Sequence, residues 1–371
     1  MTSGPNDNYT NCELPDLEPL LRLICPLLGG NSSNCQYLKK QRLQRSSVFR
    51  LTLDIGGAIR TIVLKRFAQN FSFIEQCCVK RWLMATDLSY ISPTLYCVIA
   101  EQTGNYLWHV YEDLGDNALD QKAITSEYIA IKDRGFLSPL QHKSERDHIA
   151  IIIKLIAEVH DKFQGHALLG ECRQLSNDLG SHFLITSIRD TLRAFNYLRA
   201  LDRSYTTSQI TLLDRLLDRF NTLYMQLESR CELLEKTGGQ ETLLHGDLGV
   251  KNAFVMHTAN GLTGRLIDWD HVGVGPVCYD LSTFLMQLPI DDRVWALDLY
   301  KSVRKNLLGN WPAYHEWNQL FETNEYARMA NYALWPAVAL AEKQCDWAFH
   351  DLQKIEDWFG RLAPVLPIDK E

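Results

Sequence analysis

The sequence predicts a fold of the α+β class, with a small lobe built on an antiparallel sheet and a larger, mostly helical lobe. Two patterns and the chain length predict it. Apolar and β-branched runs with hairpin signals are concentrated before residue 115, whereas apolar residues at helical spacing dominate after it. The length of 371 residues is typical of about two domains. We therefore expect an N-terminal lobe over residues 1–114, opening with a helical extension over 1–35, and a C-terminal lobe over 115–371.

The first lobe is expected to begin with a helix and continue as a sheet. Residues 14–28 carry apolar side chains at helical spacing and end at Gly29-Gly30, a C-terminal helix signal. A second helix is expected over 71–83. Five strands rich in apolar and β-branched residues are predicted over 36–43, 48–54, 58–67, 96–101 and 106–112. Asp54-Ile55-Gly56-Gly57 is a strong hairpin signal between the second and the third.

The second lobe shows apolar residues mainly at helical spacing. Helices are expected over 148–163, 209–234, 280–287, 293–308 and 324–362. Pro336 lies inside the last of these, so that stretch is either two helices or one kinked helix. The boundary between the lobes is expected near residues 112–118.

Composition and charge exclude several classes of protein. The chain is 46% hydrophobic and 22% charged, as in ordinary globular proteins, and its net charge of −7 argues against a nucleic-acid partner. It has no apolar run that could span a bilayer, and its polar N-terminus does not resemble a signal peptide. The ten cysteines are scattered without a CxxC pair. This pattern predicts reduced thiols in a cytoplasmic protein rather than disulfides, and no structural zinc.

One stretch of the second lobe carries the strongest chemical signal. His245-Gly246-Asp247-Leu248-Gly249-Val250-Lys251-Asn252 places a carboxylate and an amide five residues apart, and Leu266-Ile267-Asp268-Trp269-Asp270 adds a second carboxylate after an apolar strand. Phosphoryl transfer needs such a set, in which Asp247 orients an attacking hydroxyl and accepts its proton. Asn252 and Asp268 supply the hard oxygen ligands that Mg²⁺ prefers. The alternative is a chance Gly-Asp turn, and the two downstream metal ligands in order argue against it.

A lysine and a glutamate of the first lobe extend this chemistry. Lys65 ends the third expected strand, where its ammonium could neutralise the α and β phosphates of ATP. Such a lysine needs a carboxylate to hold it, and Glu75, on the following helix, is the only Glu between Lys65 and Glu101. The alternative is that both are ordinary solvent-exposed residues, so the pairing depends on the downstream motif.

The loop that would cover the phosphates contains no glycine. Arg45–Ser47 lies between two expected strands, 18 to 20 residues before Lys65. Ser46 and Ser47 could bind a phosphate through their hydroxyls and backbone N–H groups. Gly29–Ser33 is a competing candidate for the same role.

Two residues at the end of the first lobe are candidates for adenine binding. Glu112 and Leu114 lie at and just after the end of the last expected strand of that lobe. A segment that joins two lobes can present backbone N–H and C=O groups to an adenine without any particular side chain. An ordinary strand exit explains the same pattern, and Glu112 is chosen for its position only.

Three residues near the motif have structural alternatives. Asp280, at the start of an expected helix, is either its N-cap or a carboxylate that braces the backbone of the His245–Asp247 loop. His245 is expected to be architectural rather than a proton shuttle. Asp270 either approaches a second metal ion or lies on the surface.

Together these motifs resemble the aminoglycoside phosphotransferase and choline kinase superfamily of small-molecule kinases. The matching features are His245-Gly246-Asp247 with Asn252, Ile267-Asp268-Trp269-Asp270, Gly275-Pro276 with Tyr279-Asp280-Leu281, Lys65, and Tyr111-Glu112-Asp113-Leu114. The resemblance implies a two-lobed protein-kinase-like fold that binds ATP and Mg²⁺ between its lobes. It also implies Asp247 as the catalytic base, with Lys65 contacting phosphate and Asn252 and Asp268 as metal ligands. The glycine-free phosphate loop departs from the family pattern.

The acceptor is expected to be a small molecule. Only eleven residues separate Asp268 from Asp280, and no Ala-Pro-Glu occurs, whereas protein kinases dock a peptide on a long segment that ends in this motif. A small hydroxyl compound bound against the C-terminal helices is therefore expected, with aminoglycoside, choline, homoserine and sugar acceptors left open. The alternative is a catalytically silent kinase-like protein that binds a nucleotide or a partner. The intact set around Asp247 opposes that alternative, and the glycine-free loop favours it.

Overall fold

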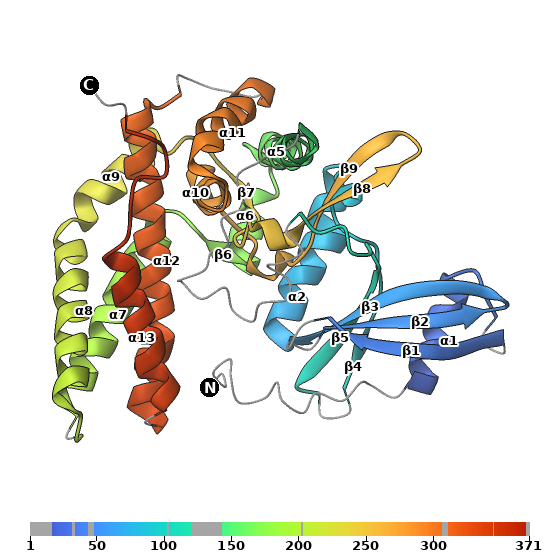
Figure 1. Ribbon diagram of the computed structural model, residues 1–371, viewed down its shortest axis with the longest axis horizontal. Coiled ribbons are helices and arrows are strands. Elements are labelled where there is room, and N and C mark those ends of the chain that lie inside the picture. Colours follow the sequence, from blue (N-terminus) through green and yellow to red (C-terminus); the bar gives the residue numbers. More distant parts are fainter. Residues whose placement is uncertain are drawn as a thin grey trace. The chain divides into compact units, whose positions relative to one another are not determined.

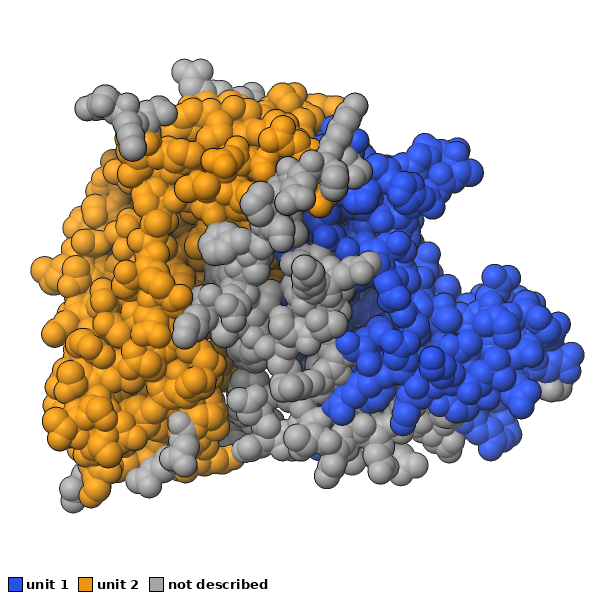
Figure 2. Space-filling model, viewed as in Figure 1, with its two compact units in different colours: residues 1–127, 147–155, 250–272 blue, residues 128–146, 156–249, 273–371 orange. Residues whose placement is uncertain are grey.

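The computed structural model describes residues 17–31, 34–43, 48–101, 104–119, 143–201, 203–305, 311–343 and 345–368. Within them the predicted fold class is confirmed, with an antiparallel sheet in the N-terminal part and a larger helical C-terminal part (Figure 1). The chain divides into two compact units (Figure 2). The first comprises residues 1–127, 147–155 and 250–272, and the second residues 128–146, 156–249 and 273–371. A lobe boundary at residue 114 stays a prediction.

The first unit is built on a five-stranded antiparallel sheet in the order β1-β2-β3-β5-β4. The strands, each within one residue of its predicted range, are β1 (Cys35–Arg42), β2 (Val48–Ile55), β3 (Ala58–Ala68), β4 (Leu95–Ala100) and β5 (Tyr106–Glu112). Gly56 and Gly57, both at positive φ, turn the chain from β2 into β3, and the N–H of Gly57 donates to Asp54. A separate hairpin is formed by β8 (Ala253–Thr258) and β9 (Gly261–Leu266).

The helical segments of the first unit are mostly short. They are α1 (Leu17–Leu27), α2 (Gln69–Cys77), the π-helical turn η2 (Cys78–Trp82), α3 (Leu83–Ala85), and the 3-10 turns η3 (Ser89–Ile91), η4 (Val250–Asn252) and η5 (Trp269–His271). The helix predicted over 71–83 is therefore a composite of three segments. Residues 147–155 of the long helix α5 (Lys143–Phe163) also belong to this unit.

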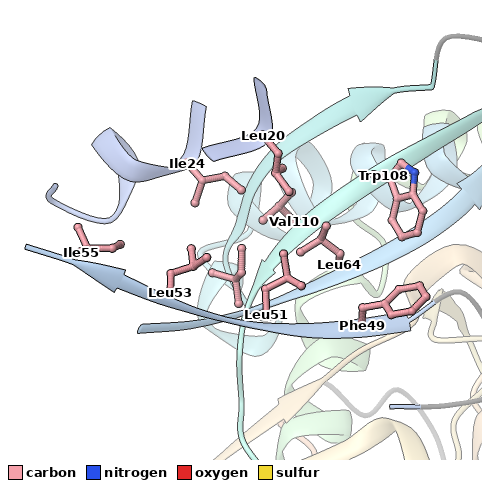
Figure 3. Close-up of a cluster of buried hydrophobic side chains, with 10 residues drawn as sticks. Leu20, Ile24, Phe49, Leu51, Leu53, Ile55, Leu64, Trp108 and Val110 are labelled. Carbon is pink, nitrogen blue, oxygen red and sulfur yellow. The ribbon is translucent and has the colours of Figure 1, made fainter. Parts of the chain in front are cut away.

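The apolar core of the sheet lies on the face that α1 covers (Figure 3). Because side chains alternate between the faces of a strand, every second residue of β2, from Phe49 to Ile55, is buried on this face. The cluster comprises Leu20, Ile24, Phe49, Leu51, Leu53, Ile55, Ile62, Leu64, Trp108 and Val110. The intervening residues of the strands lie on the opposite face of the sheet. Two of them, Lys65 of β3 and His109 of β5, are paired across these neighbouring strands. The sheet thus has one apolar face and one face that carries polar groups.

The second unit is mainly helical. Beside the remaining residues of α5, its helices are α6 (Leu169–Leu175), α7 (Ser181–Ala200), α8 (Thr207–Met225), α9 (Leu227–Thr237), α10 (Cys278–Met286), α11 (Ile290–Val303), α12 (Tyr314–Lys343) and α13 (Asp346–Phe359). The long helix α12 packs lengthwise against α7 and α13, and α8 contacts both of these (Figure 1). A small sheet places β10 (Gly273–Pro276) between β6 (Asn177–Asp178) and β7 (Glu241–Leu244).

Several helices differ from their predicted ranges. The stretch 209–234 falls into α8 and α9, which are separated at Gln226, and 324–362 falls into α12 and α13. Pro336 lies inside α12 and ends neither helix. The helix α7 was not predicted, although its buried positions, which include Leu184, Ile188, Leu192 and Phe195, recur at helical spacing.

The prediction of reduced cysteines is wrong for one pair. Cys25, near the end of α1, forms a disulfide with Cys35 at the start of β1, with their Cα atoms 6.4 Å apart. The sequence carries no motif for this pair, because the two residues meet only when α1 packs onto the sheet. The other cysteines of the described residues lie outside this disulfide.

Among the described residues, no helix combines the length and the apolar character that crossing a membrane requires.

Candidate active site

The loop that carries Asp247 lies in the second unit and is held by Asp280. It leaves β7 after Leu244, which pairs with Gly273 of β10. The carboxylate of Asp280, in the first turn of α10, accepts hydrogen bonds from the backbone N–H groups of His245, at 2.7 Å, and Gly246, at 3.0 Å. Gly246 has φ of 84°, a conformation that favours glycine. Val277, rather than Asp280, occupies the N-cap position of α10.

The buried carboxyl group of Asp280 is held in its ionised form. Only 1% of the residue is exposed. Burial alone would raise its pKa, but the hydrogen bonds from His160 and from the backbone N–H of His245 together lower the pKa below its usual value. The loop therefore rests on a buried negative charge.

Asn252 and Asp268 come together in the first unit, at the open end of the β8–β9 hairpin. The backbone N–H of Ile267 donates to the carbonyl of Asn252 at 3.0 Å, directly beyond the last paired residues of the two strands. Asp268 follows at once and has a left-handed backbone with φ of 65°, which is uncommon outside glycine and concentrates at functional sites. The buried indole of Trp269 donates to Leu266 and anchors the next turn. Hairpin pairing thus places the amide residue beside the carboxylate residue.

Lys65 lies against this second carboxylate. Its Nζ is 2.8 Å from Oδ1 of Asp268 and 3.6 Å from Oδ2 of Asp270, and it stands 4.1 Å from the centre of the Phe67 ring. Burial lowers the pKa of the ammonium, but the charges of Asp268, Asp270 and Glu75 more than offset this and raise it above its usual value. Asp270 therefore faces the same cation as Asp268.

Glu75 is buried under the polar face of the sheet, where it accepts a hydrogen bond at 2.8 Å from the hydroxyl of Tyr111. Tyr111 is also bonded to Nδ1 of His109, at 2.9 Å, and Nε2 of His109 lies 2.7 Å from the hydroxyl of Ser72. Burial raises the pKa of Glu75, and the nearby charge of Lys65 opposes this increase. Glu75 thus interacts with Lys65 through charge, while its hydrogen bond comes from Tyr111.

Helix α2 and turn η5 contact each other beside this group, with the rings of Phe71 and His271 stacked at 5.7 Å. Because α2 carries Glu75 and η5 follows Asp268, this contact brings the two carboxylate-bearing segments together. Sequence reasoning gave no role to Ser72 or His109 and named Tyr111 only within the segment Tyr111–Leu114. For His109 and Tyr111, the alternation of polar residues on one face of β5 was the available signal.

The remaining predicted positions are placed as follows. The carboxylate of Glu112 accepts hydrogen bonds from the backbone N–H and the hydroxyl of Thr94. Leu114 is buried against Ala118 and Phe254. Ser46 and Ser47 lie outside the described residues. In the competing loop, the N–H of Gly30 bonds to Cys25 at the end of α1.

The structure therefore gathers the predicted residues into two groups. Lys65, Glu75, Asn252 and Asp268 share the first unit, and His245, Asp247 and Asp280 share the second. Only four residues of the sequence lie between Asp247 and Asn252. A cation, two hard oxygen donors and a braced acidic loop are the chemistry that phosphoryl transfer requires.

Comparisons with known proteins agree with this chemistry. Residues 139–320 match the model of the phosphotransferase enzyme family. The chain is similar to the structure of an ethanolamine kinase from Plasmodium vivax, at a TM-score of 0.55 and 14% identity, covering 88% of this chain and 81% of that one. It is also similar to the structure of choline kinase LicA from Streptococcus pneumoniae, at a TM-score of 0.51 and 11% identity, covering 93% of this chain and 99% of that one. No curated protein sequence matches the chain.

A third similar structure is a spectinomycin phosphotransferase in complex with ADP and spectinomycin, at a TM-score of 0.50 and 12% identity, covering 94% of both chains. These likenesses show a shared kinase-like fold. The match to the phosphotransferase enzyme family over residues 139–320 agrees with the resemblance found in the sequence. Together they support a small-molecule phosphotransferase.

Proposed function

We propose that this protein transfers the γ-phosphoryl group of ATP, with Mg²⁺, to a hydroxyl group of a small molecule. The observation that carries the proposal is the group at the base of the β8–β9 hairpin, where Lys65 meets Asp268 and Asn252 lies beside it. Carboxylate and amide oxygens are the ligands that Mg²⁺ takes from proteins, commonly one or two of them beside phosphate oxygens. The donor set therefore fits a magnesium-nucleotide complex.

Each residue has a role in this proposal. Asp247 orients the acceptor hydroxyl and accepts its proton. Asn252 and Asp268 hold Mg²⁺, which would neutralise the charge that develops on the phosphoryl oxygens. Lys65 contacts the phosphates, and Glu75 lies close enough to Lys65 to interact with it electrostatically. His245 and Asp280 support the loop.

Nucleotide binding uses further positions in the proposal. Glu112 and Leu114 offer backbone groups to the adenine, and Ser46 and Ser47 bind a phosphate. The ADP held by the similar spectinomycin phosphotransferase supports a nucleotide ligand. A cytoplasmic location stays a prediction.

The acceptor is proposed to be a small alcohol. The similar structures are named for ethanolamine, choline and spectinomycin, which are all small hydroxyl compounds. The short segment between Asp268 and Asp280, which includes η5 and β10, leaves no long platform for a peptide.

The direct test is ADP release in the presence of Mg-ATP across a panel of alcohols that includes choline, ethanolamine, homoserine, sugars and aminoglycosides. Acceptor-dependent release is expected with at least one compound, and Asp247→Asn should reduce it by a factor of about 10²–10⁴ because the proton acceptor is lost. A catalytically silent binding protein would release no ADP with any acceptor and bind nucleotide without Mg²⁺.

The metal assignment has a test that needs no acceptor. Mg-ATP at 100 times its Kd should stabilise the wild type by about 2.7 kcal/mol, seen as a rise in Tm. Asp268→Ala is expected to abolish this rise, whereas Asp298→Ala, which removes a half-exposed carboxylate on α11, should keep it. An undiminished rise in Asp268→Ala would contradict the assignment.

A further inference from the structure

A chain of buried hydrogen bonds continues from Asp280 away from the Asp247 loop. Nε2 of His160, on α5, lies 3.4 Å from Oδ2 of Asp280. Nδ1 of His160 lies 2.8 Å from the hydroxyl of Tyr300, on α11. The guanidinium of Arg304 donates to that hydroxyl and to the carboxylate of Asp161. His160 and Tyr300 are each 1% exposed, so water does not compete for these bonds.

The donors and acceptors fix the direction of every bond in this chain. An ionised Asp280 only accepts, so Nε2 of His160 carries the proton and donates to it. Burial lowers the pKa of His160 despite the opposing effect of Asp280, so the ring is neutral and Nδ1 is an acceptor. The hydroxyl of Tyr300 therefore donates to Nδ1, and its oxygen accepts from Arg304, which can only donate. A single tautomer of His160 satisfies all of these bonds.

Both ends of this series of hydrogen bonds are anchored to elements of the second unit. Arg304 is held by Asp161, on α5, and by Gln164 one turn further on. The hydroxyl of Thr242, on β7, donates to the backbone carbonyl of His160 at 2.8 Å. Helix α5 is thus tied both to α11 and to the strand from which the Asp247 loop departs.

We propose that His160 and Tyr300 are positioning residues for Asp247, acting through Asp280. The expected effect on catalysis rests on the proposed function. The expected effect on the structure of the Asp247 loop does not. Oδ2 of Asp280 serves both His160 and the N–H of His245, while Oδ1 serves Gly246. Without the donor on His160, the buried carboxylate loses a fixing bond and can rotate, and the two N–H groups that precede Asp247 lose their fixed acceptors. A misplacement of about 1 Å in a catalytic group costs about 10²-fold in rate.

Two substitutions at one position separate donor chemistry from packing. His160→Leu removes the donor, whereas His160→Gln keeps an amide N–H near the place of Nε2. We expect kcat to fall about 10- to 100-fold in His160→Leu with KM for ATP changed less than about threefold. His160→Gln should recover most of kcat. Tyr300→Phe, which leaves Nδ1 without its donor, should lie between them and keeps the test possible if His160→Leu does not fold.

A second measurement is independent of activity. Hydrogen–deuterium exchange of residues 243–249 reports the protection of the His245 and Gly246 N–H groups directly. His160→Leu and Tyr300→Phe should speed this exchange, whereas His160→Gln should not. Thr191→Val is the matched control, because it deletes another buried hydrogen bond of the same unit, to the carbonyl of Ala330, and leaves this chain intact.

The outcomes are distinguishable. Faster exchange in both His160→Leu and Tyr300→Phe, beyond that of Thr191→Val, supports the positioning role even if no acceptor gives turnover, which would count against the proposed function alone. Exchange no faster in these two variants than in Thr191→Val would overturn the inference. Equal kcat losses in His160→Leu and His160→Gln would also overturn it, because the donor would then be irrelevant.

Discussion

The buried imidazole of His109 should make the stability of this protein depend on pH. His109 is fully buried, and burial, helped by the charges of Lys65 and Lys80, lowers its pKa to about 3. In the unfolded chain its pKa is about 6.5. Between these values the unfolded state binds a proton that the folded state excludes. The free energy of unfolding therefore falls as pH drops below about 6.5 and stops falling only near the folded pKa.

The size of the effect follows from this gap. A difference of about 3.5 pKa units at about 1.4 kcal/mol per unit gives a ceiling of about 5 kcal/mol. Because whole domains are stable by only about 5–15 kcal/mol, acid unfolding is expected well before the ceiling is reached. Between pH 7 and pH 5 the loss from His109 should be about 2 kcal/mol.

Urea unfolding at pH 7, 6 and 5 measures this loss. His109→Gln cannot take up the proton, so its free energy of unfolding should fall by about 2 kcal/mol less than that of the wild type over this range. The control is His315→Gln, which replaces an exposed histidine on α12. His160 and the carboxylates titrate in the wild type and in both variants, so their contributions to the free energy of unfolding cancel in the comparison. Parallel slopes for wild type and His109→Gln would refute the reasoning.

Two further predictions concern packing. Gly273→Ala should lower the free energy of unfolding by about 1–3 kcal/mol in thermal melts. The reason is that a Cβ at this position would lie 2.7 Å from the carbonyl oxygen of Asn177 and from the side chain of Leu179. As a control, Gly170→Ala, where a Cβ would enter open space, should be close to neutral in the same measurement. Leu20→Ala should lower the free energy of unfolding, measured by chemical denaturation, by about 2–5 kcal/mol. The reason is that Leu20 is 1% exposed and belongs to the core between α1 and the sheet. A loss below about 1 kcal/mol would show that α1 contributes little to stability.

Much of the fold could be predicted because its signals are local. The five strands of the first sheet follow from apolar alternation and from the glycines that turn β2 into β3. Helix ends were predicted less well. The break at Gln226 between α8 and α9 depends on how each helix packs, and Pro336 is accommodated inside α12. Packing of neighbouring helices overrides weak local preferences.

The candidate site divides in the same way. Asp247, Asn252 and Asp268 could be proposed because the motif spacing of a loop and a hairpin is itself local. The contact between Lys65 and Asp268 joins residues 203 apart in the chain, and the pairing of Lys65 with both Asp268 and Asp270 was not predicted. Nor was the hydrogen bond from Tyr111 to Glu75, since nothing near either residue in sequence indicates it.

By itself the sequence determined the α+β class, the motif chemistry and the resemblance to small-molecule kinases, because each is written in short stretches of neighbouring residues. Only the tertiary structure decided what holds those stretches in place. Asp280 braces a loop 34 and 35 residues before it, His160 lies 120 residues before Asp280, and Cys25 meets Cys35 only after α1 has packed. Such contacts form between buried groups whose distance in space is set by the packing of whole helices and strands. Local sequence patterns do not indicate which of these distant residues will meet.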